Sequence, residues 1–326
     1  MSHHHHHPNE PVHWLKILFD TCSVSALFLT FHLIKHFIKP FKSSFYCNDF
    51  SVNMPFRPST VTNFHLILIS LVLPFLVIIS TEIFKALHIK SQMKKKSTIF
   101  IYKVNFFSKI LQFPEQIGNL YINCGSFFFG LVATAVITDF GKVIVGRLRP
   151  NFMDVCKPDV NPYTQLCHNR TYLEPGIDFK CTALDPANVD ESRLSFPSGH
   201  SSLSFYSMIY LILFINYTWK CRRFGLIPRL VQINLLIIAI YTALSRISDN
   251  KHHPTDVLAG SCLGILISLT SFYYLTDYIK NSSLKSKYSS LVVNTYDEEN
   301  LPHFIKDNNN FAISDIDHNY NNNYNI

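Results

Sequence analysis

Apolar residues along the chain gather in six long blocks separated by polar segments. Each block approaches or exceeds the ~20 residues that an α-helix needs to cross the hydrocarbon core of a bilayer. The pattern therefore predicts an all-α polytopic membrane protein, a bundle of six transmembrane helices. The expected spans cover residues 14–37, 61–87, 117–145, 197–219, 226–244 and 255–279.

Composition agrees with a membrane domain and divides the chain into three parts. Charged residues make up 16% of the chain and hydrophobic residues 48%, whereas a soluble domain carries about 25% charged residues. These proportions exclude a disordered protein, a collagen-like repeat and a small disulfide scaffold. We expect a His-rich segment typical of a tag at 1–13, the membrane domain at 14–280, and a disordered cytosolic tail with 11 asparagines at 281–326.

Basic residues are concentrated in alternate loops of the expected bundle. The segment between the second and third spans holds six lysines and one acid, and the region between the fourth and fifth holds four basic residues and no acid. Residues 151–196 instead carry seven acids and four bases. Because basic residues gather on the cytosolic side, we expect both termini in the cytosol, and the net charge of +7 indicates topology instead of nucleic-acid binding. Residues 39–60, 151–196 and 245–254 should then face the exterior or a lumen.

This orientation makes two chemical predictions for the exoplasmic loops. Four of the eight cysteines lie there, and disulfides persist in an oxidising space. Two bridges would allow three pairings, and the sequence leaves that choice open. Asn169, in the triplet Asn169-Arg170-Thr171, should be the only glycosylated site, because the triplets at Asn216 and Asn281 are expected to face the cytosol. The candidate disulfide cysteines are Cys47, Cys156, Cys167 and Cys181.

Three polar clusters lie where the expected spans reach this same side of the membrane. They are residues 142–150 at the end of the third span, 195–202 at the start of the fourth, and 245–256 between the fifth and sixth. Ionisable residues at such positions are costly and indicate function. Snorkelling charges that anchor helix ends would explain single cations, but not two histidines and an aspartate gathered with them.

The residue types in these clusters suit a phosphate group. Lys142 and Arg149 are two helical turns apart, so they share a face if the helix continues that far. With Arg246 and a helix start at Ser198-Gly199 they form an anion site. His200 and His252 supply two bases from different helices. Asp256 follows His252 by four residues, so its carboxylate is expected to accept a hydrogen bond from that ring.

Lys-x6-Arg-Pro, Pro-Ser-Gly-His and Ser-Arg-x5-His-x3-Asp, in this order, resemble the three-part signature of the type 2 phosphatidate phosphatase superfamily. Within that superfamily the chain is similar to the lipid phosphate phosphatases of animal membranes over roughly residues 14–280. The supporting stretches are Tyr46-Cys47-Asn48-Asp49, Gly146 to Cys156 and Ser245 to Gly260.

The resemblance implies a role for each matching residue. His252 attacks phosphorus and becomes phosphohistidine, Asp256 orients its ring, and His200 protonates the leaving lipid oxygen. The phosphoryl oxygens are held by Lys142, Arg149, Arg246, Ser198 and Gly199. The implied substrates are phosphatidate, lysophosphatidate, ceramide 1-phosphate and sphingosine 1-phosphate. No metal site and no cofactor are expected, since the three cations neutralise the phosphate.

Neighbouring residues receive plainer interpretations. His253 fits neither interval of the signature and is expected to be structural. Arg147 lies about 140° around a helix from Lys142 and is expected to be peripheral. Asp249 and Lys251 are interpreted as solvated loop charges, and Asp20 in the first span as a buried, hydrogen-bonded carboxylate without a catalytic role.

Three other functions compete with a lipid phosphatase. Another branch of the superfamily could act on a sugar phosphate or a polyprenyl diphosphate. A non-catalytic signalling relative would lack part of the signature, which is complete here, and a transporter would show midplane charges and broken helices. The expected partners are lipid phosphates and membrane lipids of the plasma membrane or an endomembrane, with no nucleic acid; whether the protein forms a homo-oligomer is left open.

Overall fold

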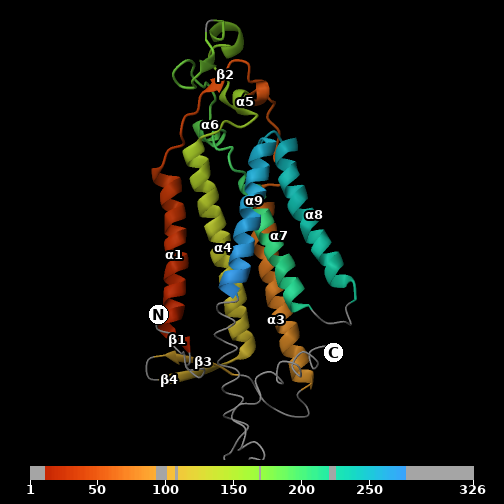
Figure 1. The fold of residues 1–326 in the computed structure, drawn as a ribbon. Helices are drawn as coiled ribbons and strands as arrows, with labels where there is room; N and C mark the ends of the chain where they lie inside the picture. Colours follow the sequence, from red (N-terminus) through yellow and green to blue (C-terminus); the bar gives the residue numbers. More distant parts are fainter. Residues whose placement is uncertain (1–11, 93–100, 107–108, 169, 220–224, 277–326) are drawn as a thin grey trace, which may run out of the picture.

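The structure is a computed structural model that describes residues 12–92, 101–106, 109–168, 170–219 and 225–276. Six long helices run side by side and carry a compact head at one end (Figure 1). They are α1 (Trp14–Phe37), α3 (Leu73–Gln92), α4 (Glu115–Val145), α7 (Gly199–Thr218), α8 (Ile227–Ser248) and α9 (Pro254–Thr270). The all-α bundle expected from the sequence is thus confirmed.

Two of these helices are extended by π-helical turns. A short helix α2 (Asn63–Ile67) and the π-turn η2 (Leu68–Val72) lead directly into α3, and η5 (Ser271–Thr276) continues α9. Pro74, at the start of α3, has no N–H to donate to a preceding carbonyl, a situation that commonly disturbs helix geometry. The Ser70 carbonyl instead accepts a hydrogen bond from the Ser207 hydroxyl at 2.7 Å, which ties η2 to α7.

Five described helices are long and apolar enough to cross a membrane: residues 14–34, 63–87, 117–145, 227–248 and 254–276. They coincide with five of the six expected spans. The sixth is α7, which packs against α3, α4, α8 and α9 and carries fully buried serines at 201, 202, 204 and 207. Because neighbouring helices surround these positions, α7 does not need an apolar face there; its membrane crossing stays a prediction.

Close contact between α7 and α9 explains one glycine of the bundle. A Cβ on Gly264 would lie 2.3 Å from the Ser202 carbonyl oxygen and 2.8 Å from the Tyr206 nitrogen. A side chain at this position would therefore push the two helices apart. Next to this contact, Phe127, Tyr206 and Tyr210 form the aromatic centre of the main core. In α1, Asp20 accepts a hydrogen bond from the Tyr121 hydroxyl at 2.8 Å, so this carboxylate is hydrogen-bonded as expected, but it is only half-buried.

Short strands were not predicted, and they mark both ends of the bundle. β1 (Val12–His13) pairs in parallel with β3 (Ile101–Phe106), which pairs antiparallel with β4 (Lys109–Pro114) at the end where α1 begins (Figure 1). In the head, β2 (Phe45–Tyr46) pairs antiparallel with β5 (Tyr172–Leu173). The connections alternate between the two ends as the six-span topology requires, and the side of the membrane that each end faces stays a prediction.

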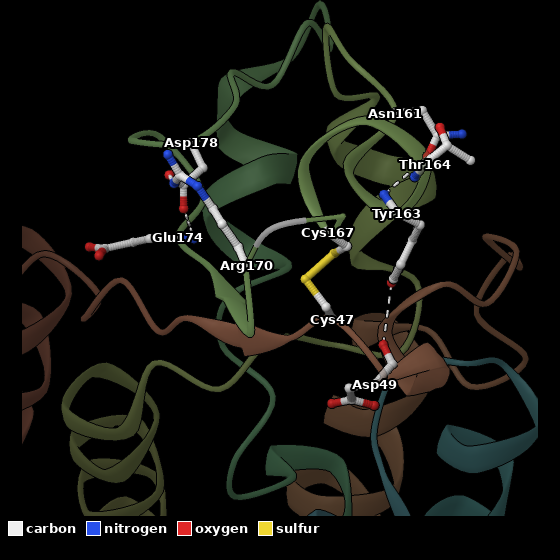
Figure 2. The surroundings of a disulfide bond; sticks show 9 residues. All are labelled: Cys47, Asp49, Asn161, Tyr163, Thr164, Cys167, Arg170, Glu174 and Asp178. Carbon is white, nitrogen blue, oxygen red and sulfur yellow. Dashed lines mark hydrogen bonds and ion pairs between the residues drawn. A yellow bond between two sulfur atoms is a disulfide. The ribbon is translucent and has the colours of Figure 1, made fainter.

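The head combines residues 38–62 with residues 146–198, which include α5 (Phe152–Cys156) and α6 (Pro186–Glu191). Disulfides join Cys47 to Cys167 (Figure 2) and Cys156 to Cys181, which selects one of the three pairings that the sequence left open. Around the first bridge, Tyr163 donates to the Asp49 carbonyl and Arg170 pairs with Asp178. Asn169, the expected glycosylation site, lies outside the described residues.

Candidate functional site

The first polar cluster leaves the membrane through a sharp turn. α4 ends at Val145, and Gly146 follows with φ of +57°, a conformation that favours glycine. A Cβ on Gly146 would lie 2.0 Å from the Phe41 carbonyl oxygen, so a side chain is also excluded by space. The chain then passes over the end of the bundle, which carries Arg147 and Arg149 away from the helical positions that the sequence spacing assumed.

Hydrogen bonds join this turn to the other two clusters. The Ser195 N–H donates to the Arg147 carbonyl at 3.0 Å, and the Ser198 N–H donates to the Asp256 carbonyl at 3.0 Å. The His253 ring donates from Nε2 to the Leu148 carbonyl at 3.1 Å. Segments that lie between 48 and 105 residues apart in sequence are thus fixed to one another, as the expected topology required.

A polar cavity of about 700 Å³ opens between these segments and the head. Four of the expected site residues line it: Arg149, His200, Arg246 and His252. Lys142 lies beside it, since its Nζ is 3.1 Å from the position that a Cβ on Gly199 would occupy. Ser198 is fully buried and precedes the first turn of α7, where unpaired backbone N–H groups favour an anion.

Each of the three expected phosphate-binding cations has a carboxylate neighbour. Lys142 pairs with Asp139 at 3.2 Å, Arg149 with Glu191 at 3.1 Å, and Arg246 with Asp249 at 2.6 Å. The buried Nε of Arg149 has no hydrogen-bond partner among the described residues. An unpaired buried donor is costly, so this atom is a ready partner for a phosphoryl oxygen in the cavity.

Asp249 and Lys251 are not the solvated loop charges that the sequence suggested. Asp249 is 5% exposed and also accepts bonds from the Thr60 N–H and hydroxyl at 2.8 and 2.7 Å, because buried Arg246 needs a counter-charge. Lys251 lines the cavity, and its Nζ lies 3.8 Å from the centre of the Phe56 ring. Burial, followed by nearby Arg149, lowers the pKa of Lys251. The segment 55–60, which the sequence did not link to the site, covers both charges.

The two histidines of the cavity each donate one ring proton to a backbone carbonyl. His252 is bonded through Nδ1 to the Ser195 carbonyl at 2.6 Å, and His200 through Nε2 to the Val61 carbonyl at 3.1 Å. A carbonyl can only accept, so in neutral His252 Nδ1 carries the proton and Nε2 keeps its lone pair. Burial, followed by Arg149 and Lys142, lowers the pKa of His252 well below the usual 6.5. This ring is therefore uncharged at neutral pH and keeps an unprotonated Nε2.

Asp256 does not meet the His252 ring as the spacing suggested. Its Oδ2 accepts from the Ser195 hydroxyl at 2.6 Å and the His253 N–H at 3.0 Å, and its Oδ1 accepts from Arg147 Nη1 at 2.5 Å. The reason is that α9 begins at Pro254, so His252 precedes the helix and the four-residue interval is not a helical turn. The carboxylate folds back over the helix start instead, and the Ser195 residue separates it from His252.

Neither Arg147 nor His253 lines the cavity that contains His252. Arg147 was expected to be peripheral, but that inference extended α4 past its end at Val145; its guanidinium in fact holds the buried carboxylate of Asp256. His253 lines a separate hollow of about 280 Å³ with Arg147 and Leu148, outside the cavity of His252.

Carboxylates near the cavity are committed to cations and backbone groups. Among the described residues, no group of three or more histidine, cysteine, aspartate or glutamate side chains could hold a metal ion. The cavity instead gathers cations around an uncharged histidine, an arrangement suited to binding an anion and attacking its central atom. That this chemistry needs no metal stays a prediction.

Known proteins resemble the chain over most of its length. The pattern of the PAP2 superfamily matches residues 124–280. "Phospholipid phosphatase 2" of Rattus norvegicus is 32% identical over 270 residues, which cover 82% of this chain and 88% of that protein. A "Putative phosphatidate phosphatase" of Drosophila melanogaster is 34% identical over 277 residues, 83% of this chain and 70% of that protein. No solved structure gives a significant match.

Proposed function

The chain belongs to the PAP2 superfamily and is a lipid phosphatase of membranes, and from this we propose that it releases inorganic phosphate from lipid phosphate monoesters through a phosphohistidine. The proposed substrates are phosphatidate, lysophosphatidate, ceramide 1-phosphate and sphingosine 1-phosphate. One observation carries the proposal: buried His252, whose Nδ1 is bonded to the Ser195 carbonyl so that Nε2 keeps its lone pair, shares a cavity with Arg149 and Arg246.

In the proposed reaction, His252 Nε2 forms a bond to phosphorus as the bond from phosphorus to the lipid oxygen breaks. His200 enters this step protonated at both nitrogens: its Nε2–H stays on the Val61 carbonyl, and the proton on Nδ1 passes to the lipid oxygen, which leaves the ring neutral. Burial and nearby Arg246 and Lys142 lower the pKa of His200 to about 3, and the negative charge of the bound phosphate opposes this effect and favours the cationic ring. Water then attacks the phosphohistidine, with His200 as the base, and frees phosphate and His252. Lys142, Arg149, Arg246 and the Ser198-Gly199 turn stabilise the charge on the phosphoryl oxygens.

The substrate class is tested with purified protein in detergent micelles. Phosphate release should be fast for the four lipid monoesters and slow for glucose 6-phosphate and a polyprenyl diphosphate. A preference for glucose 6-phosphate or the diphosphate would assign the chain to another branch of the superfamily. Absence of release from every substrate, by folded protein, would favour the non-catalytic alternative.

Chelation of divalent ions should leave turnover largely unchanged, within about twofold. The physical reason is that Lys142, Arg149 and Arg246 supply the positive charge that a bound divalent ion would otherwise bring to the phosphate. The measurement is initial-rate phosphate release before and after EDTA treatment and dialysis. Reversible loss of activity that added magnesium restores would refute this mechanism.

The proposed orientation puts both termini in the cytosol and the cavity outside the cell or in a lumen. Expression in a glycosylating cell should then give one glycan, lost in Asn169→Gln, because a glycan is added only on the lumenal side. The Asn216→Gln and Asn281→Gln variants are the matched controls and should migrate as the parent does on a gel. A glycan lost in Asn281→Gln would overturn the orientation.

A further inference from the structure

We propose that Ser195 and Arg147 are positioning residues for the nucleophile, linked to it in the order Arg147, Asp256, Ser195, His252. The inference rests on the proposed function, since it concerns how His252 is held for attack. Neither residue belongs to the three-part signature, and neither is proposed to touch the substrate.

Ser195 is held at three atoms, and each bond leads to a different part of the site. Its N–H donates to the Arg147 carbonyl at 3.0 Å, and its hydroxyl donates to Asp256 Oδ2 at 2.6 Å. Its own carbonyl accepts the Nδ1 proton of His252 at 2.6 Å. The residue is fully buried, so water does not compete for these bonds. The orientation of the His252 ring is therefore set by Ser195.

Arg147 fixes the carboxylate to which Ser195 is anchored. The Asp256 carboxylate is fully buried, and an isolated buried charge is costly. Arg147 Nη1 reaches its Oδ1 at 2.5 Å and also donates to the Thr255 hydroxyl at 2.7 Å, while the arginine side chain stays 38% exposed. The half-exposed guanidinium thus neutralises the charge of the carboxylate. It leaves Oδ2 free to accept from the Ser195 hydroxyl and the His253 N–H.

The chain of bonds has a chemical consequence for the reacting ring. When Nε2 takes up the phosphoryl group, the ring becomes cationic while Nδ1 keeps its proton. That proton then bonds more strongly to the Ser195 carbonyl, and the carboxylate behind Ser195 polarises the chain in the favourable direction. The orientation of the His252 ring and the charge that develops on it both affect the attack on phosphorus. The cations that bind the phosphate lie elsewhere in the site.

A merely structural role would make a different prediction. If these bonds only held the three segments together, their loss would distort the cavity and weaken phosphate binding together with turnover. A positioning role instead predicts loss of kcat with binding preserved. The inhibition constant of inorganic phosphate measures binding without attack, and rapid-quench trapping measures the rate of phosphoenzyme formation.

The test uses Ser195→Ala, which removes the hydroxyl and keeps the carbonyl. The matched control is Ser204→Ala, because Ser204 is equally buried and, among the described residues, its hydroxyl donates to the Ser201 carbonyl of its own helix alone. We expect Ser195→Ala to lower kcat and phosphoenzyme formation on the order of 10- to 100-fold, with the phosphate inhibition constant within about threefold. Ser204→Ala should match the parent. Equal kcat in the two variants, or parallel loss of kcat and phosphate binding in Ser195→Ala, would overturn the proposal.

A double-mutant cycle tests whether Ser195 acts through Asp256. In an Asp256→Asn background, Ser195→Ala should cost much less than it does in the parent, because the link is already broken. Additive losses would overturn the proposed order. Arg147→Gln, on the exposed side, gives an independent measurement if Ser195→Ala does not fold, and an unchanged kcat there would remove Arg147 from the chain. Failure of the parent and Ser204→Ala to release phosphate would instead refute the proposed function.

Discussion

Replacement of His252 by alanine should abolish turnover, because the covalent step loses its nucleophile. The adjacent His253 provides the matched control. Its ring nitrogen Nε2 is bonded to the Leu148 carbonyl, and it lies outside the cavity that His252 lines. His253→Ala should therefore keep substantial activity, with some loss of stability from the broken bond.

Rapid-quench trapping of an acid-labile phosphoenzyme from labelled lysophosphatidate is the decisive measurement for this pair. The parent and His253→Ala should form the labelled species within a single turnover, and His252→Ala should form none. Label retained in His252→Ala and lost in His253→Ala would show that His253 is the nucleophile and that the assignment to His252 is wrong.

The second large effect is expected for Asp256→Asn, which should lower kcat by a factor on the order of 10⁴, as for the aspartate of a Ser-His-Asp enzyme. An amide has one accepting oxygen, whereas Asp256 accepts from Arg147, the Ser195 hydroxyl and the His253 N–H. At least one of these donors would face an NH₂ group, and Arg147 would lose its counter-charge. The Ser195 carbonyl that holds His252 would then lose its anchor.

Steady-state kcat, with thermal unfolding in detergent as a check of folding, measures this effect. The matched control is Asp178→Asn, because Asp178 also pairs with an arginine, Arg170, and also accepts a backbone N–H, but lies in the head (Figure 2). That variant should retain turnover. Comparable losses in both variants would mean that Asp256 contributes only to stability.

The fall of kcat/KM at acid pH that reflects protonation of His252 should occur below pH 6.5. A histidine attacks only when unprotonated, and burial together with Arg149 and Lys142 lowers the pKa of His252. Activity that depends on this ring is thus retained as the pH falls through 6.5 and is lost only at the lower pKa. A second substrate, whose phosphate group has a different pKa, separates ionisation of the substrate from protonation of His252.

The apolar pattern by itself determined the helical bundle, because a chain that crosses a bilayer must satisfy its backbone within each helix. Five expected spans correspond to apolar helices on this ground. In α7 the apolar pattern is interrupted, because its buried serines contact other helices. The short strands at both ends were missed, since pairs as short as β2 and β5 leave no alternation of apolar and polar positions to read.

The sequence by itself also identified the cavity residues, because helix ends on one side of a membrane must meet at one surface. Arg149, His200, Arg246 and His252 line one cavity for this reason. Only the tertiary structure decided their partners. The spacing of two residues predicts which side chains meet only within one continuous helix, yet α4 ends before Arg147 and α9 begins after His252. The disulfide pairing, the burial of Asp249, and the contact of Asp256 with Ser195 and Arg147 depend on where separate segments approach in space, which spacing along one chain does not encode.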